Sequence, residues 1–230
     1  MSASSFQDKR VCSDSPMHII LIADDSVSMR QEQRAQQVNS GIQRWLNELL
    51  FLSAEGQKYW FYFSYITFGT KPKVWDTNVP LPELIIENLE PISGKLGGTN
   101  MAPAIERAIA VLQAHLPKAS DCPPFVYLYT DGEADDPVRS LEVAEKLKSM
   151  PLPCGPPRLV VLGFDAADTP FCRKLASFPE FYLRCNDSET LANLLPEIGS
   201  LVAKHSLQEA EAGIRQQVQE VASVSKPSSW

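Results

Sequence analysis

Apolar runs and stretches of helical spacing alternate along most of this chain. Continuous runs of apolar, β-branched and aromatic residues predict buried strands at residues 18–23, 58–69, 124–133, 158–166 and 180–186. Apolar positions spaced as on one face of a helix predict helices at residues 29–52, 101–116, 137–150, 169–177 and 188–205. Residues 71–81 predict an edge strand or hairpin arm, because Pro72 and Pro80 cannot donate ladder hydrogen bonds.

Strands that alternate with helices are typical of an α/β protein. Helices between consecutive strands favour right-handed crossovers, which give a doubly wound, largely parallel sheet with helices on both faces. No linker interrupts the pattern, so residues 17–204 are expected to form a single domain. Residues 1–16 are polar, lack the apolar run of a signal peptide, and are expected to form a flexible leader.

Residues 205–230 are expected to form a C-terminal helical extension or tail. Four apolar residues with coiled-coil-like spacing would suit contact with a partner helix through residues 206–224: Leu207, Ile214, Val218 and Val221. The alternatives are a helix folded back on the domain and a frayed tail. These alternatives are preferred, because the apolar stripe covers only about two heptads.

Composition narrows the possible functions by exclusion. A hydrophobic content of 44% supports a sizeable core and argues against global disorder. The net charge of −7 argues against a nucleic-acid reader, which needs a basic surface. No stretch approaches the roughly 20 apolar residues of a membrane-spanning helix. The five cysteines are dispersed and form no CxxC pair, which is typical of reduced thiols in a cytoplasmic protein.

Three oxygen-rich segments stand at the carboxyl end of a predicted strand or at the start of a predicted helix. Asp24, Ser26 and Ser28 follow the first strand, Thr99 precedes the middle helix in GGTN, and Asp131 follows the FVYLY strand in TDGE. An ordinary surface turn would explain any one segment. Because ligands of open α/β sheets bind at the carboxyl ends of the strands, the three segments together predict one site.

The side chains of these segments indicate a hard divalent cation. In extended backbone Asp24, Ser26 and Ser28 would face the same way, while Asp25 points elsewhere. Two carboxylates balance the charge of one divalent ion, and three hydroxyls bring the protein ligands to about five. An octahedral ion of the magnesium type takes about six ligands. One position therefore stays open for an oxygen of another molecule, such as a carboxylate.

This set of residues resembles the metal-ion-dependent adhesion site (MIDAS) of von Willebrand factor type A (vWA) domains. The likeness covers roughly residues 17–204 and follows the family's order: Asp24-x-Ser26-x-Ser28, then Thr99, then Asp131. It implies a Rossmann-like vWA fold and a Mg²⁺ or Mn²⁺ ion at these five residues, with Ca²⁺ less expected. It also implies a protein partner whose Asp or Glu carboxylate, or a phosphate, completes the coordination.

Two details refine the resemblance. The family often has glycine between the two serines, whereas this chain has Val27, which is not a ligand. The segments YITFG, GGTNMAPAIE and TDGE look most like bacterial intracellular members of the tellurium-resistance-associated type. That likeness implies a non-catalytic scaffold in a multi-component bacterial stress or defence system, acting in the cytoplasm.

Two other functions stay open on the sequence. The first is a Mg²⁺-dependent phosphoester hydrolase, although DDSVS lacks an Asp-x-Asp pair and no lysine or histidine lies in the site segments. The second is recognition of a phosphorylated partner through the metal. Four further acidic residues are expected to form a solvated rim that concentrates cations, rather than to bind the metal: Asp25, Glu133, Asp135 and Asp136.

Overall fold

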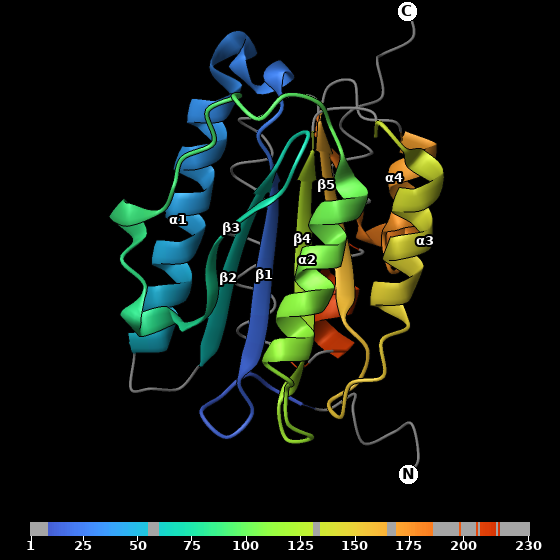
Figure 1. The fold of residues 1–230 in the computed structure, drawn as a ribbon. Helices are drawn as coiled ribbons and strands as arrows, with labels where there is room; N and C mark the ends of the chain where they lie inside the picture. The colour runs from blue at the N-terminus through green and yellow to red at the C-terminus, as the bar shows by residue number, and fades with distance from the viewer. Residues whose placement is uncertain are drawn as a thin grey trace, which may run out of the picture.

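The computed structural model describes residues 9–54, 60–130, 134–164 and 169–185, together with residues 198, 206, 208–214 and 216. Six strands in this part of the chain form one sheet in the order β3-β2-β1-β4-β5-β6 (Figure 1). The strands are β1 (Met17–Asp24), β2 (Phe61–Phe68), β3 (Lys73–Pro80), β4 (Cys122–Thr130), β5 (Arg158–Phe164) and β6 (Tyr182–Cys185).

The sheet is parallel except at one edge. β1, β2, β4, β5 and β6 pair in parallel, and β3 runs antiparallel to β2. The predicted α/β architecture with a largely parallel sheet is therefore confirmed. The prediction of an edge strand over residues 71–81 is also confirmed, since β3 stands last in the strand order.

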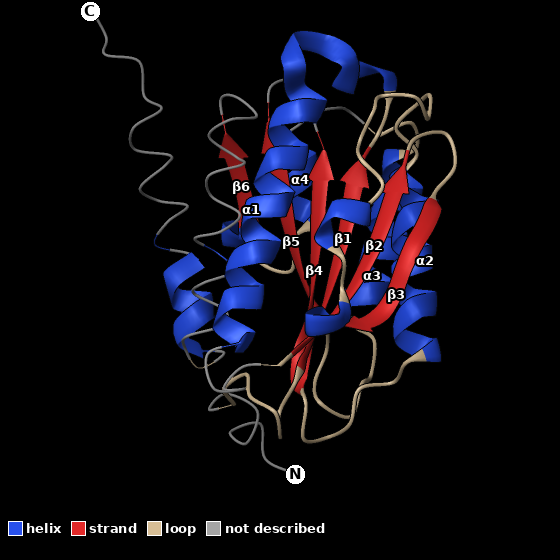
Figure 2. Ribbon diagram, turned by 90° about the vertical axis from the view of Figure 1, so that its left-hand side faces the viewer, coloured by secondary structure: helices blue, strands red, loops and turns tan. Residues whose placement is uncertain are grey.

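Helices cover both faces of the sheet, as the alternating pattern predicts. α1 (Arg34–Ala54) lies on one face, and α2 (Met101–Ala114) and α3 (Pro137–Lys148) pack side by side on the other (Figures 1 and 2). α4 (Thr169–Leu175) packs against α3 and β5. Short 3₁₀ helices occur at Val27–Gln33 (η2), Leu81–Glu83 (η3), Ile86–Asn88 (η4) and Pro179–Phe181 (η5).

The core follows from the apolar strands. All eight residues of β1 and all nine of β4 are buried, which explains why their sequences are continuous apolar runs rather than alternating ones. Trp45 of α1 packs against one face of the sheet. Its ring lies edge-on to that of Tyr127, with 5.0 Å between the ring centroids. Aromatic residues of β2 such as Phe61 and Phe63 are buried and form part of this core.

The strand order fixes where a site can form. β2 follows β1 in the chain and lies on one side of it in the sheet, whereas β4 lies on the other side. The chain therefore reverses its winding direction between β1 and β4. Ligands of doubly wound sheets bind at such a switch point, outside the carboxyl ends of the strands. These ends lie at the top of the sheet in Figure 1. Asp24 is the last residue of β1, and Thr130 is the last residue of β4.

The predicted helix over residues 29–52 is divided in the structure. The 3₁₀ helix η2 covers Val27–Gln33, and α1 begins only at Arg34. Gln33 adopts a left-handed conformation with φ of 61°, which an α-helix cannot contain, and this residue separates the two helices. The segment after Ser26 is therefore a tight turn rather than the first turn of an α-helix.

The described end of the leader differs from the prediction of a flexible segment over residues 1–16. Val11 is buried, and the Lys9 ammonium donates to the backbone carbonyl of Asp121 at 2.7 Å. The backbone N–H of Cys122 donates to the carbonyl of Pro16 at 2.9 Å. Residues 9–16 therefore pack along the amino-terminal end of the sheet, and residues 1–8 lie outside the described part of the chain.

The described part of the C-terminal segment folds back on the domain. Ser206 and Glu209 form a reciprocal capping box, with the Glu209 carboxylate accepting from the Ser206 N–H at 2.8 Å. Residues 208–214 are helical, with Ile214 fully buried and Glu211 bound to Arg158 at 2.6 Å. These contacts favour the folded-back helix. The predicted helix at 188–205 lies outside the described residues, apart from residue 198.

Candidate metal centre

Asp24 ends β1 and is fully buried. Its carboxylate accepts a hydrogen bond at Oδ1 from the backbone N–H of Ser26, at 2.9 Å, and one at Oδ2 from the hydroxyl of Thr130, at 2.8 Å. These bonds orient the carboxylate across the switch point.

The hydroxyls of Ser26 and Ser28 lie 2.9 Å apart. The prediction that extended backbone aligns these hydroxyls is wrong. A 3₁₀ turn begins at Val27 instead, where the N–H of Met29 donates to the carbonyl of Ser26 at 3.1 Å. The tight turn brings the two hydroxyls together directly after Asp24.

Thr99 is almost buried, with 9% of its surface exposed, and stands just before α2. Its N–H donates to the Asp135 carboxylate at 2.9 Å, and its carbonyl accepts from the Asp135 N–H at 3.0 Å. The next residue, Asn100, donates its N–H to the carbonyl of Gly69 at 3.0 Å. Thr99 is therefore held between the end of β2 and the segment that leads into α3.

Backbone hydrogen bonds join the loops around the site into one unit. The Val27 N–H donates to the Gly97 carbonyl at 2.9 Å, and the Leu96 N–H donates to the Asp25 carbonyl at 3.0 Å. The Thr70 N–H donates to the Leu96 carbonyl at 2.6 Å. Gly97 has φ of 87°, a conformation that glycine adopts without steric cost. The segment that carries Thr99 is thus fixed directly to the turn that carries the serines.

Asp25 supports these loops from inside the protein. It is 5% exposed, and its carboxylate accepts from the backbone N–H of Ser93, at 2.6 Å, and from that of Gly94. Its own N–H donates to the Phe68 carbonyl at 2.7 Å. Burial and the Asp25 carboxylate, in that order, raise the pKa of Tyr65 well above its ordinary value. Asp25 therefore anchors the loop at residues 92–97 beneath the surface.

The prediction of a solvated acidic rim needs correction. Asp25 is buried and bound to backbone amides, so it is not part of a rim. Asp135 and Asp136 are exposed, but each holds a backbone N–H: Asp135 that of Thr99, and Asp136 that of Arg139 at 3.0 Å as the N-cap of α3. Glu133 lies outside the described residues.

The donor atoms fit a hard divalent cation. Neighbouring ligands of an octahedral Mg²⁺ ion, bound at about 2.1 Å, lie about 3 Å apart, and the Ser26 and Ser28 hydroxyls already have this spacing. Asp24 places a buried carboxylate two residues before Ser26, and the segment that carries Thr99 is bonded to the serine turn through Val27 and Gly97. Asp131 lies outside the described residues, so its place in the site stays a prediction.

The residues that sequence reasoning missed are the supports of the site. Thr130 was not singled out, and its signal is its position directly before Asp131 at the end of a strand. Asp25 was assigned to the rim because nothing local in the sequence reveals its two long-range amide partners. Within the described residues, the candidate site included, no group of three or more His, Cys, Asp or Glu side chains could hold a metal ion, so the described donors here are the Asp24 carboxylate and hydroxyls.

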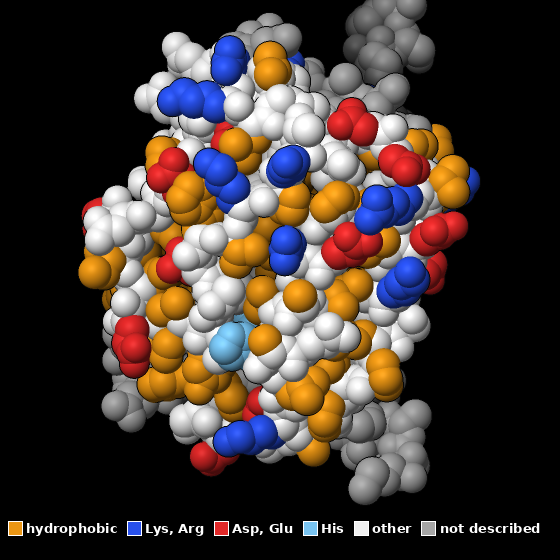
Figure 3. Space-filling model, in the orientation of Figure 1, with side chains coloured by type: hydrophobic (Ala, Val, Ile, Leu, Met, Phe, Trp, Pro, Cys, Tyr) orange, Lys and Arg blue, Asp and Glu red, His pale blue; other side chains and the backbone are white. Residues whose placement is uncertain are grey.

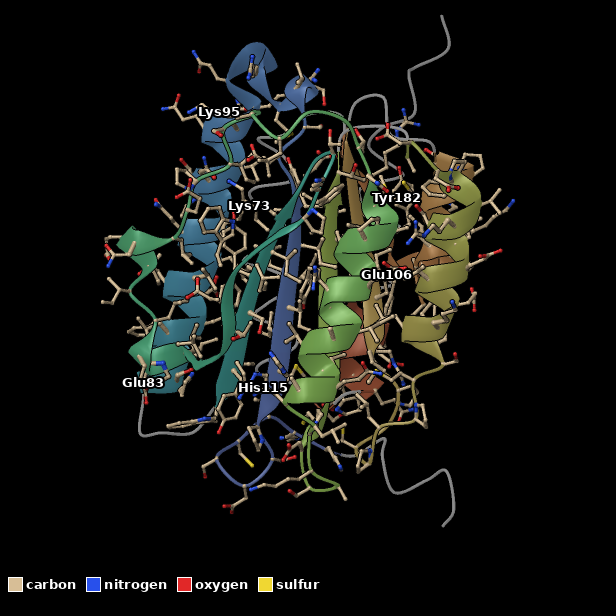
Figure 4. The ribbon with its side chains drawn as sticks, in the orientation of Figure 1. Lys73, Glu83, Lys95, Glu106, His115 and Tyr182 are labelled. Atoms are coloured by element: carbon tan, nitrogen blue, oxygen red, sulfur yellow. The ribbon has the colours of Figure 1, made fainter. Side chains whose placement is uncertain are left out.

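Both described histidines lie at the other end of the sheet. His18, near the start of β1, and His115, directly after α2, line a cavity of about 360 Å³ (Figure 4 labels His115). The Ser64 hydroxyl lies 2.9 Å from His18 Nε2 and accepts from the Asn78 N–H at 2.8 Å. Burial, helped by His115, lowers the pKa of His18 to about 4. These imidazoles are remote from Asp24.

The fold is that of a vWA domain, as comparison with solved structures shows. No protein-family model and no curated protein sequence matches the chain. The solved structures described below are 14–18% identical to this chain, so they establish the fold alone. No helix in the described part of the chain has the length and apolar character needed to span a membrane.

Three of these structures are particularly informative. Proximal thread matrix protein 1 from the mussel byssus, solved with a zinc-occupied MIDAS motif, is 18% identical with a TM-score of 0.62 over 85% of this chain and 48% of its own. The pilus adhesin SpaC from Lactobacillus rhamnosus GG is 15% identical with a TM-score of 0.71 over 85% of this chain and 32% of its own. A von Willebrand factor type A protein from Catenulispora acidiphila is 14% identical with a TM-score of 0.63 over 82% of this chain and 43% of its own. This chain therefore spans less than half the length of each.

Proposed function

We propose that this chain is a non-catalytic protein-interaction module that binds its partner through a divalent cation. The cation is Mg²⁺ or Mn²⁺, and its protein ligands are Asp24, Ser26, Ser28, Thr99 and Asp131. When bound, the ion supplies an electrophilic coordination position that a partner's carboxylate completes. The observation that carries the proposal is the pair of serine hydroxyls, 2.9 Å apart, beside a buried carboxylate at the switch point of the sheet.

The chain's own residues prepare this position. Thr130 and the Ser26 N–H fix the Asp24 carboxylate, and the loop bonds from Val27 and Asp25 hold the Thr99 segment against it. A site fixed before binding loses little conformational entropy when the ion and the partner arrive. The zinc-occupied MIDAS motif of proximal thread matrix protein 1 supports a cation at such a site in a protein of this fold.

The non-catalytic assignment is supported by the position of the histidines. Histidine is the side chain that most often serves as general acid or base, and it must lie within hydrogen-bond reach of the reacting atoms. The two described histidines, His18 and His115, lie at the opposite end of the sheet, so neither can serve in that role here.

The resemblance of YITFG, GGTN and TDGE to the tellurium-resistance-associated type supports a finer proposal. We infer that the partner is another protein of a bacterial cytoplasmic stress or defence system. An acidic protein of the same operon that is captured in Mg²⁺ and released by EDTA would support this assignment.

The metal site can be tested with matched variants. We expect Asp24→Asn and Thr99→Val to weaken Mn²⁺ binding by at least about 100-fold, because loss even of residues that only support a ligand costs about 10–100-fold. Asp14→Asn and Thr77→Val, at exposed positions away from the site, should leave it unchanged. The free-Mn²⁺ signal in electron paramagnetic resonance measures the affinity directly.

Two outcomes would contradict the proposal. Equal Mn²⁺ affinity of the Asp24→Asn variant and the unmodified protein would show that the proposed metal site is wrong. Turnover of p-nitrophenyl phosphate that requires Mg²⁺ and is lost in Asp24→Asn would instead establish the hydrolase. Partner capture from the native cell with and without EDTA then tests whether the ion carries the interaction.

A further inference from the structure

Three exposed basic residues border the candidate metal centre on the side of β2 and η2. Arg30 lies in η2, Lys71 follows β2, and Lys95 lies in the loop that Asp25 anchors. We refer to Arg30, Lys71 and Lys95 as the basic strip. In Figure 3 blue side chains gather over the upper left of this face, where Figure 4 labels Lys95.

Contacts between the loops make the basic strip continuous with the site. The Arg30 side chain packs so closely on Gly94 that a Cβ there would overlap it, and Lys95 is the next residue. The Thr70 N–H donates to the carbonyl of Leu96, and the Thr70 hydroxyl accepts from the N–H of Gly98, one residue before the proposed ligand Thr99. Lys71 therefore stands beside the loop that holds both Lys95 and Thr99.

The basic strip carries charge that the described part of the chain does not pair. Elsewhere several cations have a carboxylate partner, such as Arg139 with Glu106 at 3.0 Å and Arg158 with Glu211 at 2.6 Å. No ion pair within the described residues includes a member of the basic strip. Asp25 lies beneath it, but its carboxylate is bound to the amides of the loop. A local excess of positive charge is thus exposed on a chain whose net charge is −7.

An exposed apolar residue stands between the two serines in the sequence. Val27 is 51% exposed, and its N–H donates to the carbonyl of Gly97, so the loop that follows Lys95 fixes its position. This exposed side chain is therefore available for contact with a partner segment bound at the site. The side of α3 differs, because its exposed residues next to Thr99 are Asp135 and Asp136.

We propose that the basic strip selects an acidic partner segment and sets its direction. One carboxylate of the segment completes the metal coordination, an apolar side chain contacts Val27, and further Asp or Glu residues lie along Arg30, Lys71 and Lys95. The reverse direction would bring those acidic residues toward Asp135 and Asp136, where like charges repel. This inference rests on the proposed metal-dependent function and names the class of partner that it serves.

The test compares two synthetic peptides by fluorescence anisotropy. One carries a single glutamate in a Gly/Ser background, and the other carries the same glutamate followed by a valine and three more glutamates. In Mg²⁺ at about 25 mM salt, where surface charges are weakly screened, we expect the multi-acidic peptide to bind about 10-fold more tightly. The difference should shrink at about 300 mM salt, because the charges involved are exposed.

Charge reversals locate the effect. Lys71→Glu and Lys95→Glu should each weaken binding of the multi-acidic peptide by about five-fold and leave the single-glutamate peptide nearly unchanged. Lys118→Glu and Lys146→Glu are the matched controls, because both lysines are exposed and lie after α2 and in the last turn of α3, away from the site. Mn²⁺ affinity of all four variants, measured without peptide, keeps metal binding apart from partner binding.

The possible results separate the two proposals. Metal-dependent binding of both peptides, with the strip variants equal to their controls, overturns the role of the basic strip and leaves the metal-dependent function intact. Binding of the multi-acidic peptide that persists in EDTA overturns the metal bridge. A phosphoserine peptide that outcompetes the multi-acidic one would overturn the carboxylate assignment, and failure of the multi-acidic peptide to bind in Mg²⁺ overturns the proposed partner class.

Discussion

Replacement of Asp25 by alanine should distinguish a residue that supports the site from the residues proposed to bind the metal. The carboxylate accepts from the N–H groups of Ser93 and Gly94 and is 5% exposed, so water cannot easily take its place. A hydrogen bond to a charged group contributes roughly 1.5–3 kcal/mol. Removal of two such bonds, offset partly by the lower cost of burying a neutral side chain, should reduce the free energy of unfolding by about 3 kcal/mol.

Differential scanning calorimetry in EDTA measures this loss without any contribution from metal binding. For a chain of this size about 3 kcal/mol corresponds to a fall in Tm of roughly 6–12 °C. Asp24→Asn should change the metal-free Tm much less, because asparagine can still accept from the Ser26 N–H. The exposed Asp14→Ala should stay within about 0.5 kcal/mol of the unmodified protein.

The two adjacent aspartates make this prediction refutable. If Asp25→Ala kept the unmodified Tm in EDTA but lost Mn²⁺ binding as fully as Asp24→Asn, then Asp25 would be the ligand. The assignment of Asp24 to the metal would then be wrong. Weaker Mn²⁺ binding together with a lowered Tm is the expected result, because Asp25 holds the loop that leads to Thr99.

Two further changes test the fold, one at the far end of the sheet and one next to the site. Burial lowers the pKa of His18 from 6.5 to about 4, so the unfolded chain binds the proton first as pH falls. The free energy of unfolding should therefore drop by about 3 kcal/mol between pH 6.5 and pH 4. Urea titrations should show a flatter profile for His18→Gln than for the control His115→Gln, and parallel profiles would refute the role of His18. In Gly69→Ala a Cβ would overlap the backbone carbonyl of Leu96. We expect this variant to lose about 2 kcal/mol or more of stability and to bind Mn²⁺ more weakly; unchanged calorimetry and Mn²⁺ affinity would show that the loops need not approach so closely.

The sheet could be predicted from sequence because its strands are buried on both faces. HIILIA and FVYLY are apolar without interruption, which a surface helix or an edge strand would not tolerate, and the structure confirms both as central strands. The helices between them fix the parallel direction and thus the end of the sheet where Asp24 lies. The position of the candidate site followed from topology, without knowledge of any side-chain contact.

The local geometry of the site could not be predicted, because long-range bonds determine it. Whether residues 26–28 are extended or in a 3₁₀ turn depends on Gly97, which binds Val27 from about 70 residues further along the chain. The role of Asp25 likewise depends on Ser93 and Gly94. The basic strip could not be predicted from composition either, since its three residues are far apart in an acidic sequence.

The two aspartates at the end of β1 therefore serve one site in different ways. Asp24, the last residue of β1, turns toward Thr130 of β4, whereas Asp25, which follows the strand, turns toward the loop at residues 92–97. The loop that Asp25 anchors carries Lys95 and leads to Thr99. If Asp24 and Thr99 bind the metal as proposed, metal binding stabilises that loop, and by reciprocity any partner that holds the loop through Lys95 increases the affinity for the metal. If the basic strip does engage an acidic partner, ion and partner affinity are coupled through the Asp25 anchor rather than through the ion alone.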